Sequence, residues 1–318
     1  MPILGGNLPE GKGSAVPGLG NGRLRNGWLG SNEVSPQTLH IPGARWRSTP
    51  GHPKSDQSSL ELPGSILWPI LSAGRPPCSP ARCSLPWLNS TIAPQRPLPA
   101  PMRLLGITDL HGSPAALDRI LASAGPVDLI LLGGDLTNFG SPADAERLVR
   151  RAEATGTRVL AVAGNCDSAE IDQRLVELGG SLMARGLVHN GVGVHGLSAM
   201  PPWRSNMYQL TEDELAEVLR AGYAQIAGAE HHMLLSHPPP HGGKLDCTSA
   251  GRHVGSTALR SFIDETQPEL VLCGHIHEAR GVEKLGRTTA VNCGPAAAGF
   301  YALAELGDEL KVDLRRAC

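Results

Sequence analysis

Hydrophobic positions become regular in this chain only from Met102 onward. Short apolar runs typical of buried strands then alternate with stretches of helical periodicity, beginning with Arg103 to Thr108, Val127 to Leu132 and Arg158 to Ala163. Near-continuous apolar strands that alternate with helices are typical of a parallel sheet with helices on its faces. The pattern therefore predicts an α/β domain.

Polar residues mark where the expected helices begin. Ser113 and Ser141 each precede a proline, the residue best suited to the first position of a helix. Thr211, with Glu214 three residues later, forms a capping-box pattern, in which each side chain bonds the other residue's backbone N–H. The helices are expected at Ser113 to about Ala124, Ser141 to about Thr155, Ser168 to Leu178, Thr211 to Gly228 and near Ser256 to Glu265.

The second half of the chain adds further strands. Asn190-Gly191, between apolar residues of the segment Leu187 to His195, predicts a hairpin. Apolar runs at His232 to Ser236 and Glu269 to Cys273 are two more candidate strands. The last forty residues have the pattern of antiparallel strands, expected at Gly281 to Leu285, Thr288 to Asn292, Phe300 to Leu306 and Leu310 to Leu314.

Residues 1–101 differ in composition from the rest. They hold 17 of the 27 prolines and have a net charge of +5, whereas residues 102–318 have a net charge of −7. Glycine, proline and serine interrupt every apolar run, which leaves too little apolar surface to offset the entropy of ordering the chain. We interpret residues 1–101 as a disordered, low-complexity extension and residues 102–318 as one domain. A start of translation at Met102, which would make the extension non-native, is favoured over a transit peptide.

Charge and cysteine usage exclude several classes of protein. The mildly acidic body argues against a broad nucleic-acid-binding face. The sequence has no run of about 18 apolar residues, the length that spans a bilayer, and no secretory signal pattern at its N-terminus. The seven cysteines are odd in number and lack disulfide-scaffold spacing, which favours a reducing compartment. We therefore expect a cytoplasmic protein without a membrane partner.

Polar side chains with metal-binding chemistry follow the ends of five expected strands. The most distinctive group is Gly274-His275-Ile276-His277, a tight turn in which two imidazoles can face one small volume. Ligands bind beyond the carboxyl ends of parallel strands, and neutral imidazole is the commonest protein ligand for a transition metal. The side chains at the strand ends are Asp109, His111, Asp135, Asn165, His237, His275 and His277.

These seven side chains form an oxygen and nitrogen ligand set without thiolate, which suits Mn, Fe, Zn or Ni. Seven ligands are too many for one tetrahedral ion, so two ions are expected, with Asp135 as the carboxylate that bridges them. Two metals a few ångströms apart clamp the attacking and leaving oxygens of an in-line phosphoryl displacement. An ordinary turn or a hydrogen-bonded histidine explains any single motif equally well, but not all of them in this order.

The blocks Asp-x-His, Gly-Asp, Gly-Asn-x-Asp, Ser-His-Pro and Gly-His-x-His, in this order, resemble the calcineurin-like metallophosphoesterase family from Met102 to about Arg316. The resemblance implies a four-layer α/β/β/α sandwich with a dimetal site at the carboxyl ends of the strands. It also implies that one metal is held by Asp109, His111, Asp135 and His277. The other metal would be held by Asp135, Asn165, His237 and His275.

One block departs from the commonest pattern of this family. Gly164-Asn165-Cys166-Asp167 has a cysteine where many members have a histidine that protonates the leaving oxygen. A cysteine thiol can donate a proton, but Cys166 is more simply interpreted as a small buried filler. The block resembles that of small prokaryotic phosphodiesterases that work without the histidine. The segment from His237 to Ser256 is similar to predicted phosphoesterases related to the cyclic-nucleotide phosphodiesterase group.

This segment supplies candidates for the missing acid and for substrate binding. His241 and His253 are candidate acids, and Lys244 and Arg252 are candidates for holding the substrate phosphate. An exposed loop side chain without a catalytic role is the alternative for each of the four.

The favoured function is a dinuclear metal-dependent phosphoesterase in which a metal-activated water attacks phosphorus directly. Asp135 and His237 would take part in catalysis, Asn165 would also contact substrate, and manganese is the favoured metal. The expected partner is a small, nucleotide-like phosphoester, and a diester is preferred over a monoester. The alternatives are a non-catalytic protein-binding scaffold on the same fold and a protein phosphatase; the oligomeric state stays open.

Overall fold

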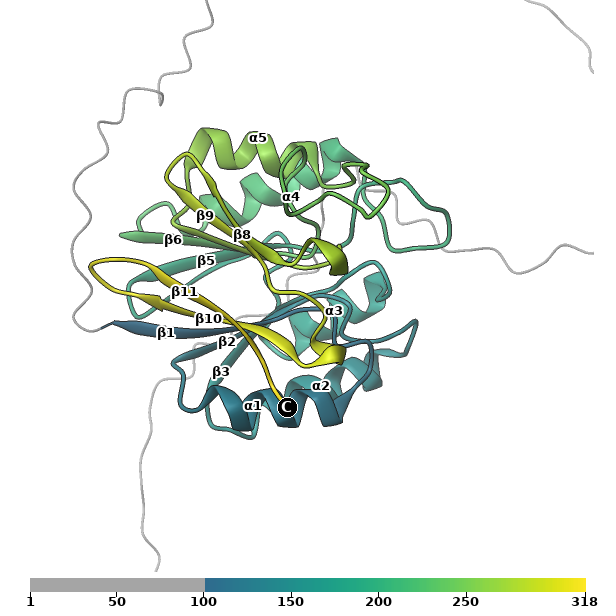
Figure 1. Cartoon of the computed structure of the whole chain (residues 1–318), viewed down its shortest axis with the longest axis vertical. Helices are drawn as coiled ribbons and strands as arrows, with labels where there is room; N and C mark the ends of the chain where they lie inside the picture. Colours follow the sequence, from purple (N-terminus) through teal and green to yellow (C-terminus); the bar gives the residue numbers. More distant parts are fainter. Residues whose placement is uncertain (1–100) are drawn as a thin grey trace, which may run out of the picture. The chain divides into compact units, whose positions relative to one another are not determined.

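The computed structural model describes residues 101–318, shown in Figure 1. The extension predicted for residues 1–101 lies outside this range except for its last residue, so its interpretation stays a prediction. Within the described range the chain forms two β-sheets, five α-helices and two short 3-10 helices, η1 (His277–Ala279) and η2 (Ala296–Ala298).

The first sheet has five strands in the order β11-β10-β1-β2-β3. Three neighbouring strands, β1, β2 and β3, are parallel, whereas β10 is antiparallel to both β1 and β11. The strands are β1 (Met102–Ile107), β2 (Leu129–Gly133), β3 (Arg158–Val162), β10 (Phe300–Leu306) and β11 (Lys311–Arg316).

The second sheet has six strands in the order β4-β5-β6-β7-β9-β8. Its four central strands are parallel, and the edge strands β4 and β8 are antiparallel to their neighbours. The strands are β4 (Gly186–His189), β5 (Val192–Leu197), β6 (His231–Ser236), β7 (Leu270–Cys273), β8 (Gly281–Leu285) and β9 (Thr288–Asn292).

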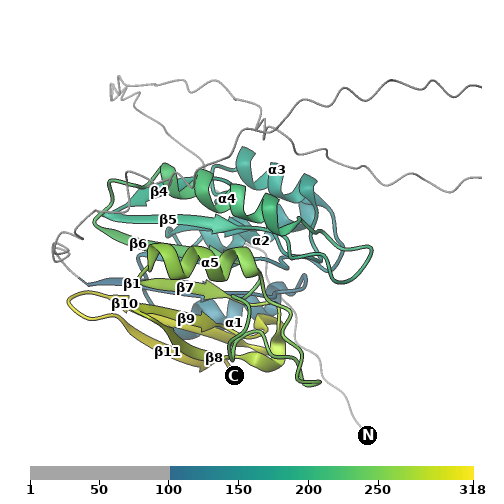
Figure 2. The same cartoon turned by 90° about the horizontal axis from the view of Figure 1, so that it is seen from above.

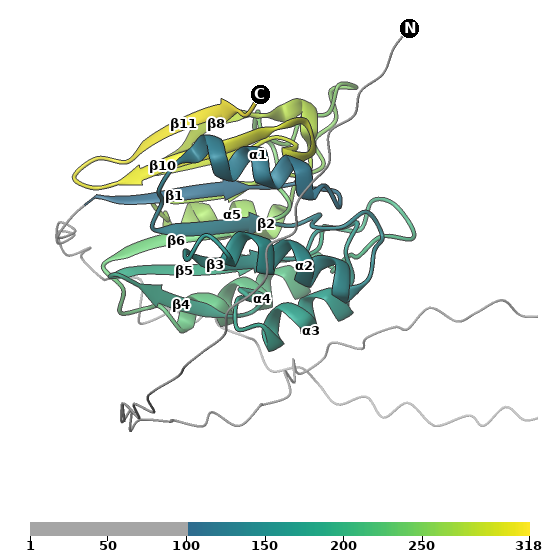
Figure 3. The ribbon, with the colours of Figure 1, turned by 90° about the horizontal axis from the view of Figure 1, so that it is seen from below.

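Helices cover the outer face of each sheet. Three helices, α1 (Pro114–Ala124), α2 (Pro142–Glu153) and α3 (Ala169–Glu177), lie on the first sheet, as Figure 3 shows. The other two, α4 (Glu212–Ala224) and α5 (Thr257–Thr266), lie on the second sheet, as Figure 2 shows. The two sheets face each other between these helical layers (Figure 1).

Three buried apolar clusters fill the three spaces between the layers. One joins α1–α3 to the first sheet, one lies between the sheets, and one joins α4 and α5 to the second sheet. Successive side chains of a strand point to opposite faces, so Leu105 and Leu104 on β1 belong to different clusters, and both are fully buried. Burial on both faces explains the near-continuous apolar runs. The predicted four-layer α/β/β/α sandwich is confirmed.

The helices begin where the sequence predicts. Each of the five α-helices in residues 101–318 follows a serine or threonine whose side chain accepts a backbone N–H from the first turn. The capping box of Thr211 and Glu214 is present. The expected end of this helix at Gly228 is wrong, because α4 ends at Ala224. Beyond it, Gln225 and Ile226 donate to carbonyls three residues back, which tightens the chain out of the α-helix.

The hairpin predicted at Asn190-Gly191 joins β4 and β5. Both residues have positive φ, 50° and 84°, as a two-residue hairpin turn requires. The four C-terminal strands also form two antiparallel pairs, but the pairs join different sheets. The pair β8–β9 extends the second sheet, where β9 is parallel to β7, and β10–β11 extends the first. The antiparallel pattern of the sequence did not reveal this division.

Candidate metal centre

The structure brings all seven predicted ligands together at the carboxyl ends of five strands. The loops after β1, β2 and β3 carry four of them, and the loops after β6 and β7 carry three. The centre therefore lies between the two sheets and takes side chains from both. From the first sheet come Asp109, His111, Asp135 and Asn165, and from the second come His237, His275 and His277.

Four of these residues have an uncommon backbone conformation. Asp109, His111, Asp135 and His275 all have positive φ, between 46° and 68°. Residues other than glycine rarely adopt this left-handed region, and such residues gather at functional sites. The sharp turns therefore lie where the chain leaves the strands, at residues that carry candidate ligands.

Glycines next to the ligands are required because the backbone is crowded there. A Cβ atom on Gly164 would lie 2.2 Å from both the backbone N and the Oδ1 of Asp135. A Cβ atom on Gly274 would lie 2.2 Å from Oδ2 of Asp109. Carbon atoms do not approach polar atoms so closely, so these two positions accept only glycine without a shift of the neighbouring ligand.

Asp135 lies between a histidine from each predicted ligand set. Its Oδ1 is 3.5 Å from Nε2 of His237, and its Oδ2 is 3.7 Å from Nε2 of His111. The Cys166 backbone N–H donates to Oδ1 over 2.7 Å and fixes the carboxylate. The two oxygens of one buried carboxylate therefore face opposite sides of the centre.

Hydrogen bonds fix the orientation of the buried His237 ring. Its Nδ1 lies 3.1 Å from the Gly133 carbonyl oxygen and can only donate to it, which leaves Nε2 unprotonated in the neutral ring. That Nε2 atom is 2.8 Å from Oδ1 of Asn165. Two acceptors facing each other at this distance favour a shared cation between them. This arrangement suits an imidazole that binds a metal through Nε2 while its other nitrogen holds the ring in place.

The other side of the centre is formed by Asp109, His111 and His277. The Nε2 atom of His277 is 3.4 Å from Oδ1 of Asp109 and 3.4 Å from Nε2 of His111. Asp109 is fully buried and accepts the backbone N–H of His275. Burial raises the pKa of Asp109, but the hydrogen bond with His277 and the neighbouring histidines outweigh it and lower the pKa to about 2. Asp109 is therefore a carboxylate at neutral pH.

His275 carries a buried nitrogen without a hydrogen-bond partner. Its Nε2 atom is inaccessible and unpaired within residues 101–318. Its ring lies 5.1 Å from that of His237, and burial lowers its pKa to about 3. An unpaired buried nitrogen costs free energy unless another group binds it, and a neutral imidazole is a good metal ligand.

The donor atoms fit divalent metal ions. Ligand atoms of Asp109, His111 and His277 lie within 4.8 Å of one another, and so do those of Asp109, Asp135 and His237. The Cys166 thiol also lies within 4.8 Å of ligand atoms of His111 and Asp135. Burial raises the pKa of this thiol, and the charge of Asp135 raises it further, so Cys166 stays protonated and is a poor proton donor.

Two polar residues without a predicted role hold the ligand loops. Asp167 accepts N–H bonds from Leu136, Thr137 and Gly164, which ties the loop after β2 to the loop after β3. Asn292, at the end of β9, donates to the carbonyls of Leu245, Gly274 and Ile276, and so holds the turn that carries His275 and His277. A polar residue at a strand end was the signal that could have identified Asn292.

The two candidate acids lie together on the loop between β6 and α5. The rings of His241 and His253 are 5.9 Å apart, and Nδ1 of His253 is 2.8 Å from Oδ1 of the buried Asp246. Neither histidine makes a hydrogen bond or ion pair with the seven predicted ligands within residues 101–318. The same loop reaches the centre's edge, because Ser249 donates to Glu278, the residue after His277.

Lys244 and Arg252 make no hydrogen bond or ion pair with the seven predicted ligands within residues 101–318. Both side chains are exposed, and neither makes a hydrogen bond or ion pair in the part of the chain that the structure describes. The backbone N–H of Lys244 donates to Glu283, and that of Arg252 donates to Thr248.

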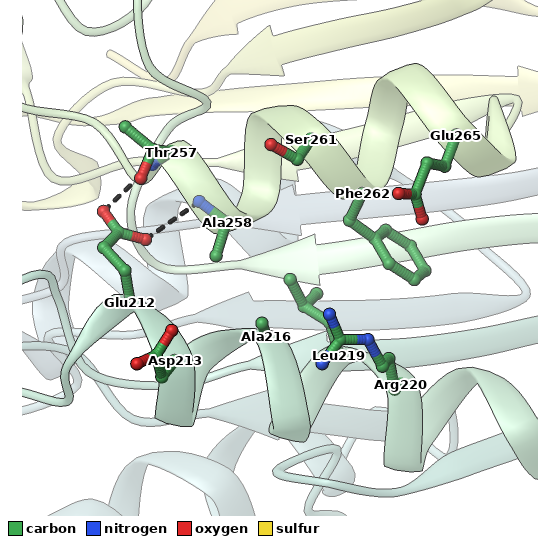
Figure 4. A pocket seen from close by; sticks show the side chains of 10 residues that line it. All are labelled: Glu212, Asp213, Ala216, Leu219, Arg220, Thr257, Ala258, Ser261, Phe262 and Glu265. Atoms are coloured by element: carbon green, nitrogen blue, oxygen red, sulfur yellow. Dashed lines mark hydrogen bonds between the residues drawn. The ribbon is translucent and has the colours of Figure 1, made fainter. Parts of the chain in front are cut away.

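The cavities beside the helices differ in their relation to the centre. One, of about 510 Å³, adjoins the centre at His111 and extends past Asn138 to Arg147 and Arg151 on α2. The other, of about 230 Å³, lies between α4 and α5 and includes none of the predicted site residues (Figure 4). There the Glu212 carboxylate accepts the backbone N–H groups of Thr257 and Ala258 (Figure 4), which identifies it as a cap of α5.

Comparisons with known proteins agree with the fold. The sequence model of the family described as calcineurin-like phosphoesterase matches residues 102–279. An uncharacterized protein of Methanocaldococcus jannaschii is 32% identical over 209 residues, which cover 63% of this chain and 91% of that protein. A probable cyclic nucleotide phosphodiesterase of Synechococcus is 32% identical over 179 residues, which cover 54% of this chain and 66% of that protein.

A solved structure has the same architecture at low sequence identity. The crystal structure of TT1561 of Thermus thermophilus is 19% identical, with a TM-score of 0.53, and the match covers 67% of this chain and 98% of that one. In residues 101–318, every helix is too short or too polar to cross a membrane.

Proposed function

Because the chain belongs to the calcineurin-like phosphoesterase family, we propose that it hydrolyses phosphodiesters with the help of two divalent metal ions. The observation that carries the proposal is the position of Asp135, whose two oxygens face His237 on one side and His111 on the other. A carboxylate placed in this way suits a bridge between two ions. When bound, the ions would lower the pKa of a water and neutralise phosphoryl oxygens.

The chain's own residues would then orient these groups. His237, held by the Gly133 carbonyl, presents only Nε2, and Asn165 presents its amide oxygen to the same space. The Asn165 Nδ2 group, which lies 2.9 Å from Sδ of Met207, is the proposed contact to a phosphoryl oxygen. Asp109, His111, His275 and His277 complete the proposed ligand set. Manganese is the proposed metal, since oxygen and nitrogen donors without thiolate suit it.

We assign proton donation to His253, with Asp246 as the residue that positions it. Asp246 occupies Nδ1 of His253, so Nε2 is the atom free to give a proton to the leaving oxygen. The buried carboxylate is itself fixed by the backbone N–H groups of Gly242, Gly243 and Gly255, so it holds the imidazole in one orientation. His241 beside it is the second candidate, and Lys244 and Arg252 are the proposed exposed contacts for substrate phosphate.

The proposal also includes the class of substrate and the cellular location of the protein. A small nucleotide-like phosphodiester is the proposed substrate, which the name of the Synechococcus relative supports. The lack of a disulfide pattern supports a cytoplasmic protein, with residues 102–318 as its catalytic domain.

The test is hydrolysis of bis-p-nitrophenyl phosphate and p-nitrophenyl phosphate by the full chain, after chelation and after addition of Mn²⁺. We expect turnover only with metal and a higher rate with the diester. Asp135→Asn and His237→Ala should each lower kcat/KM by at least about 100-fold, because each removes a ligand. His189→Ala, on the outer strand β4, is the matched control and should keep full activity.

His253→Ala separates the acid from the ligands in the same experiment. Its rate should fall by about 100-fold with an alkyl ester, whose leaving oxygen needs a proton, and far less with p-nitrophenyl esters. An equal loss with both kinds of ester would contradict the assignment to His253. A folded protein that turns over no ester with Mn²⁺, Fe²⁺, Zn²⁺ or Ni²⁺ would instead favour the scaffold.

A further inference from the structure

A loop between β5 and α4 is attached directly to the metal centre. The Tyr208 backbone N–H donates to the Asn165 carbonyl over 3.0 Å, and Asn165 Nδ2 lies 2.9 Å from Sδ of Met207. The Met200 N–H donates to the Tyr208 carbonyl, and the Leu210 N–H donates to the Met200 carbonyl, which closes the loop at its base. Residues 201–207 therefore project from a fixed neck beside a proposed ligand.

Trp203 is the aromatic residue within residues 201–207 of this loop, and its ring lies beside His275. The two ring centroids are 6.2 Å apart, and the planes meet at 74°, an edge-to-face contact. The indole N–H donates to Sδ of Met200 over 3.2 Å, which fixes the direction of the ring. The side chain nevertheless remains 43% exposed.

Packing of the apolar core does not explain the position of Trp203. Four large hydrophobic side chains are exposed within residues 101–318, and Trp203 belongs to none of the three buried clusters. Val188 and Val282 lie on the edge strands β4 and β8, and Phe139 lies on the loop after β2. Of these four exposed side chains, Trp203 is the one whose ring contacts the ring of a proposed ligand.

An exposed indole beside a phosphoester site offers a flat apolar face to the rest of the substrate. Stacking on such a face needs only a planar π-system, and it is strong for nucleobases. The phosphoryl group would be held at the ligands while the planar group lies against the ring. The hydrogen bond to Met200 keeps the indole in one orientation, which lowers the entropy lost when a ligand binds.

We propose that Trp203 selects phosphoesters that carry a planar aromatic group, such as a purine, by stacking on it. The inference rests on the proposed function, because the phosphoryl group must bind at the centre. Trp203 would be a substrate contact in addition to the seven proposed ligands and the candidate residues on the loop between β6 and α5.

The test compares two ligands that share a sugar phosphate and differ only in the base, AMP and ribose 5-phosphate. Binding to the full chain in Mn²⁺ is measured by calorimetry. We expect AMP to bind about 10-fold more tightly than ribose 5-phosphate, within the range of about 5- to 150-fold that one stacked base gives. Trp203→Leu should reduce this ratio to about 1, Trp203→Phe should retain a part of it, and Val188→Ala should not change it.

Ribose 5-phosphate distinguishes the possible failures. Its affinity should be the same in the wild type and in all three variants. AMP should also quench fluorescence in the wild type more than in Trp203→Phe, since the other four tryptophans are common to both. A wild-type ratio near 1, an unchanged ratio in Trp203→Leu, or a parallel loss of both ligands in that variant would each overturn the stacking role. A wild type that binds neither ligand would refute the phosphoester site itself.

Discussion

Single residues in the centre occupy positions where the surroundings allow little choice of side chain. Gly164 is the clearest case, because it lies against the backbone and carboxylate of Asp135 and against the His237 ring. Asn292 and Asp167 hold ligand loops through several hydrogen bonds each, so their loss would leave buried carbonyl or N–H groups unpaired. The geometry of the ligands thus depends on residues that would bind no metal.

Gly164→Ala should remove metal binding, whereas Gly228→Ala should not. The added methyl would lie 2.2 Å from the Asp135 carboxylate, so the proposed bridge must move, but at Gly228 nothing lies within 4 Å. We expect at least about 100-fold weaker Mn²⁺ binding in Gly164→Ala by calorimetry. Gly228→Ala should stay within about 0.5 kcal/mol of the wild type in stability and bind metal normally. Normal Mn²⁺ affinity in Gly164→Ala would show that the crowding around Gly164 does not affect metal binding.

At the scale of elements, two stacked histidines, one buried and one half-buried, lie where helices α4 and α5 pack on the second sheet. His195 on β5 and His232 on β6 stack with ring centroids 4.9 Å apart, and Tyr223 and Phe262 from the two helices surround them. Both nitrogens of His195 and Nε2 of His232 are unpaired within the described residues. Burial lowers the pKa of His232 to about 4 and that of His195 well below its usual value.

The fold should therefore lose stability in acid, and His195→Phe should reduce this loss. The unfolded chain binds protons at a pKa of about 6.5 and the folded chain only at lower pH. The stabilisation is complete above pH 6.5 and falls below it, by about 1.4 kcal/mol per histidine for each pH unit until the folded pKa is reached. Urea unfolding from pH 7.5 to 4.5 should show a shallower decline for His195→Phe. Phenylalanine fills a similar volume and leaves no nitrogen unpaired, so stability at pH 7.5 should be equal or higher. Identical slopes for both proteins would refute this origin.

At the scale of the whole domain, the proposed metal ligands join two sheets that otherwise meet through an apolar cluster. Loops after β1, β2 and β3 supply four ligands and loops after β6 and β7 supply three. Ions bound here would connect the two halves of the sandwich. Binding to the folded chain alone would then stabilise the whole domain and not only its loops.

Metal should raise the melting temperature of the full chain. At 100 times its dissociation constant, an ion stabilises the fold by about 2.7 kcal/mol, which corresponds to about 5 to 10 °C for a domain of this size. The shift on adding Mn²⁺ to chelated protein should be present in the wild type and in His189→Ala. It should be lost or greatly reduced in Asp135→Asn and His237→Ala. A full shift in both ligand variants would place the metal elsewhere.

The sequence by itself determined the elements and the identity of the candidate ligands. Apolar runs marked the strands because strands buried on both faces need apolar residues throughout, and Ser113, Ser141 and Thr211 marked helix starts because capping is local. The order of the polar blocks indicated the family and, through it, four layers. The local pattern predicted the end of α4 at Gly228, but the helix ends at Ala224. The next residues, Gln225 and Ile226, donate to carbonyls three residues back and so leave the α-helix.

Only the tertiary structure decided which distant segments meet. It divided the C-terminal hairpins between the sheets, because pairing depends on which edge is open and not on the strand's own pattern. It placed Asn292 under the histidine turn, Asp246 behind His253 and Trp203 beside His275, although the residues of each pair share no motif. Side-chain contacts across such loops depend on the packing of the whole domain, so no local pattern of residues specifies them.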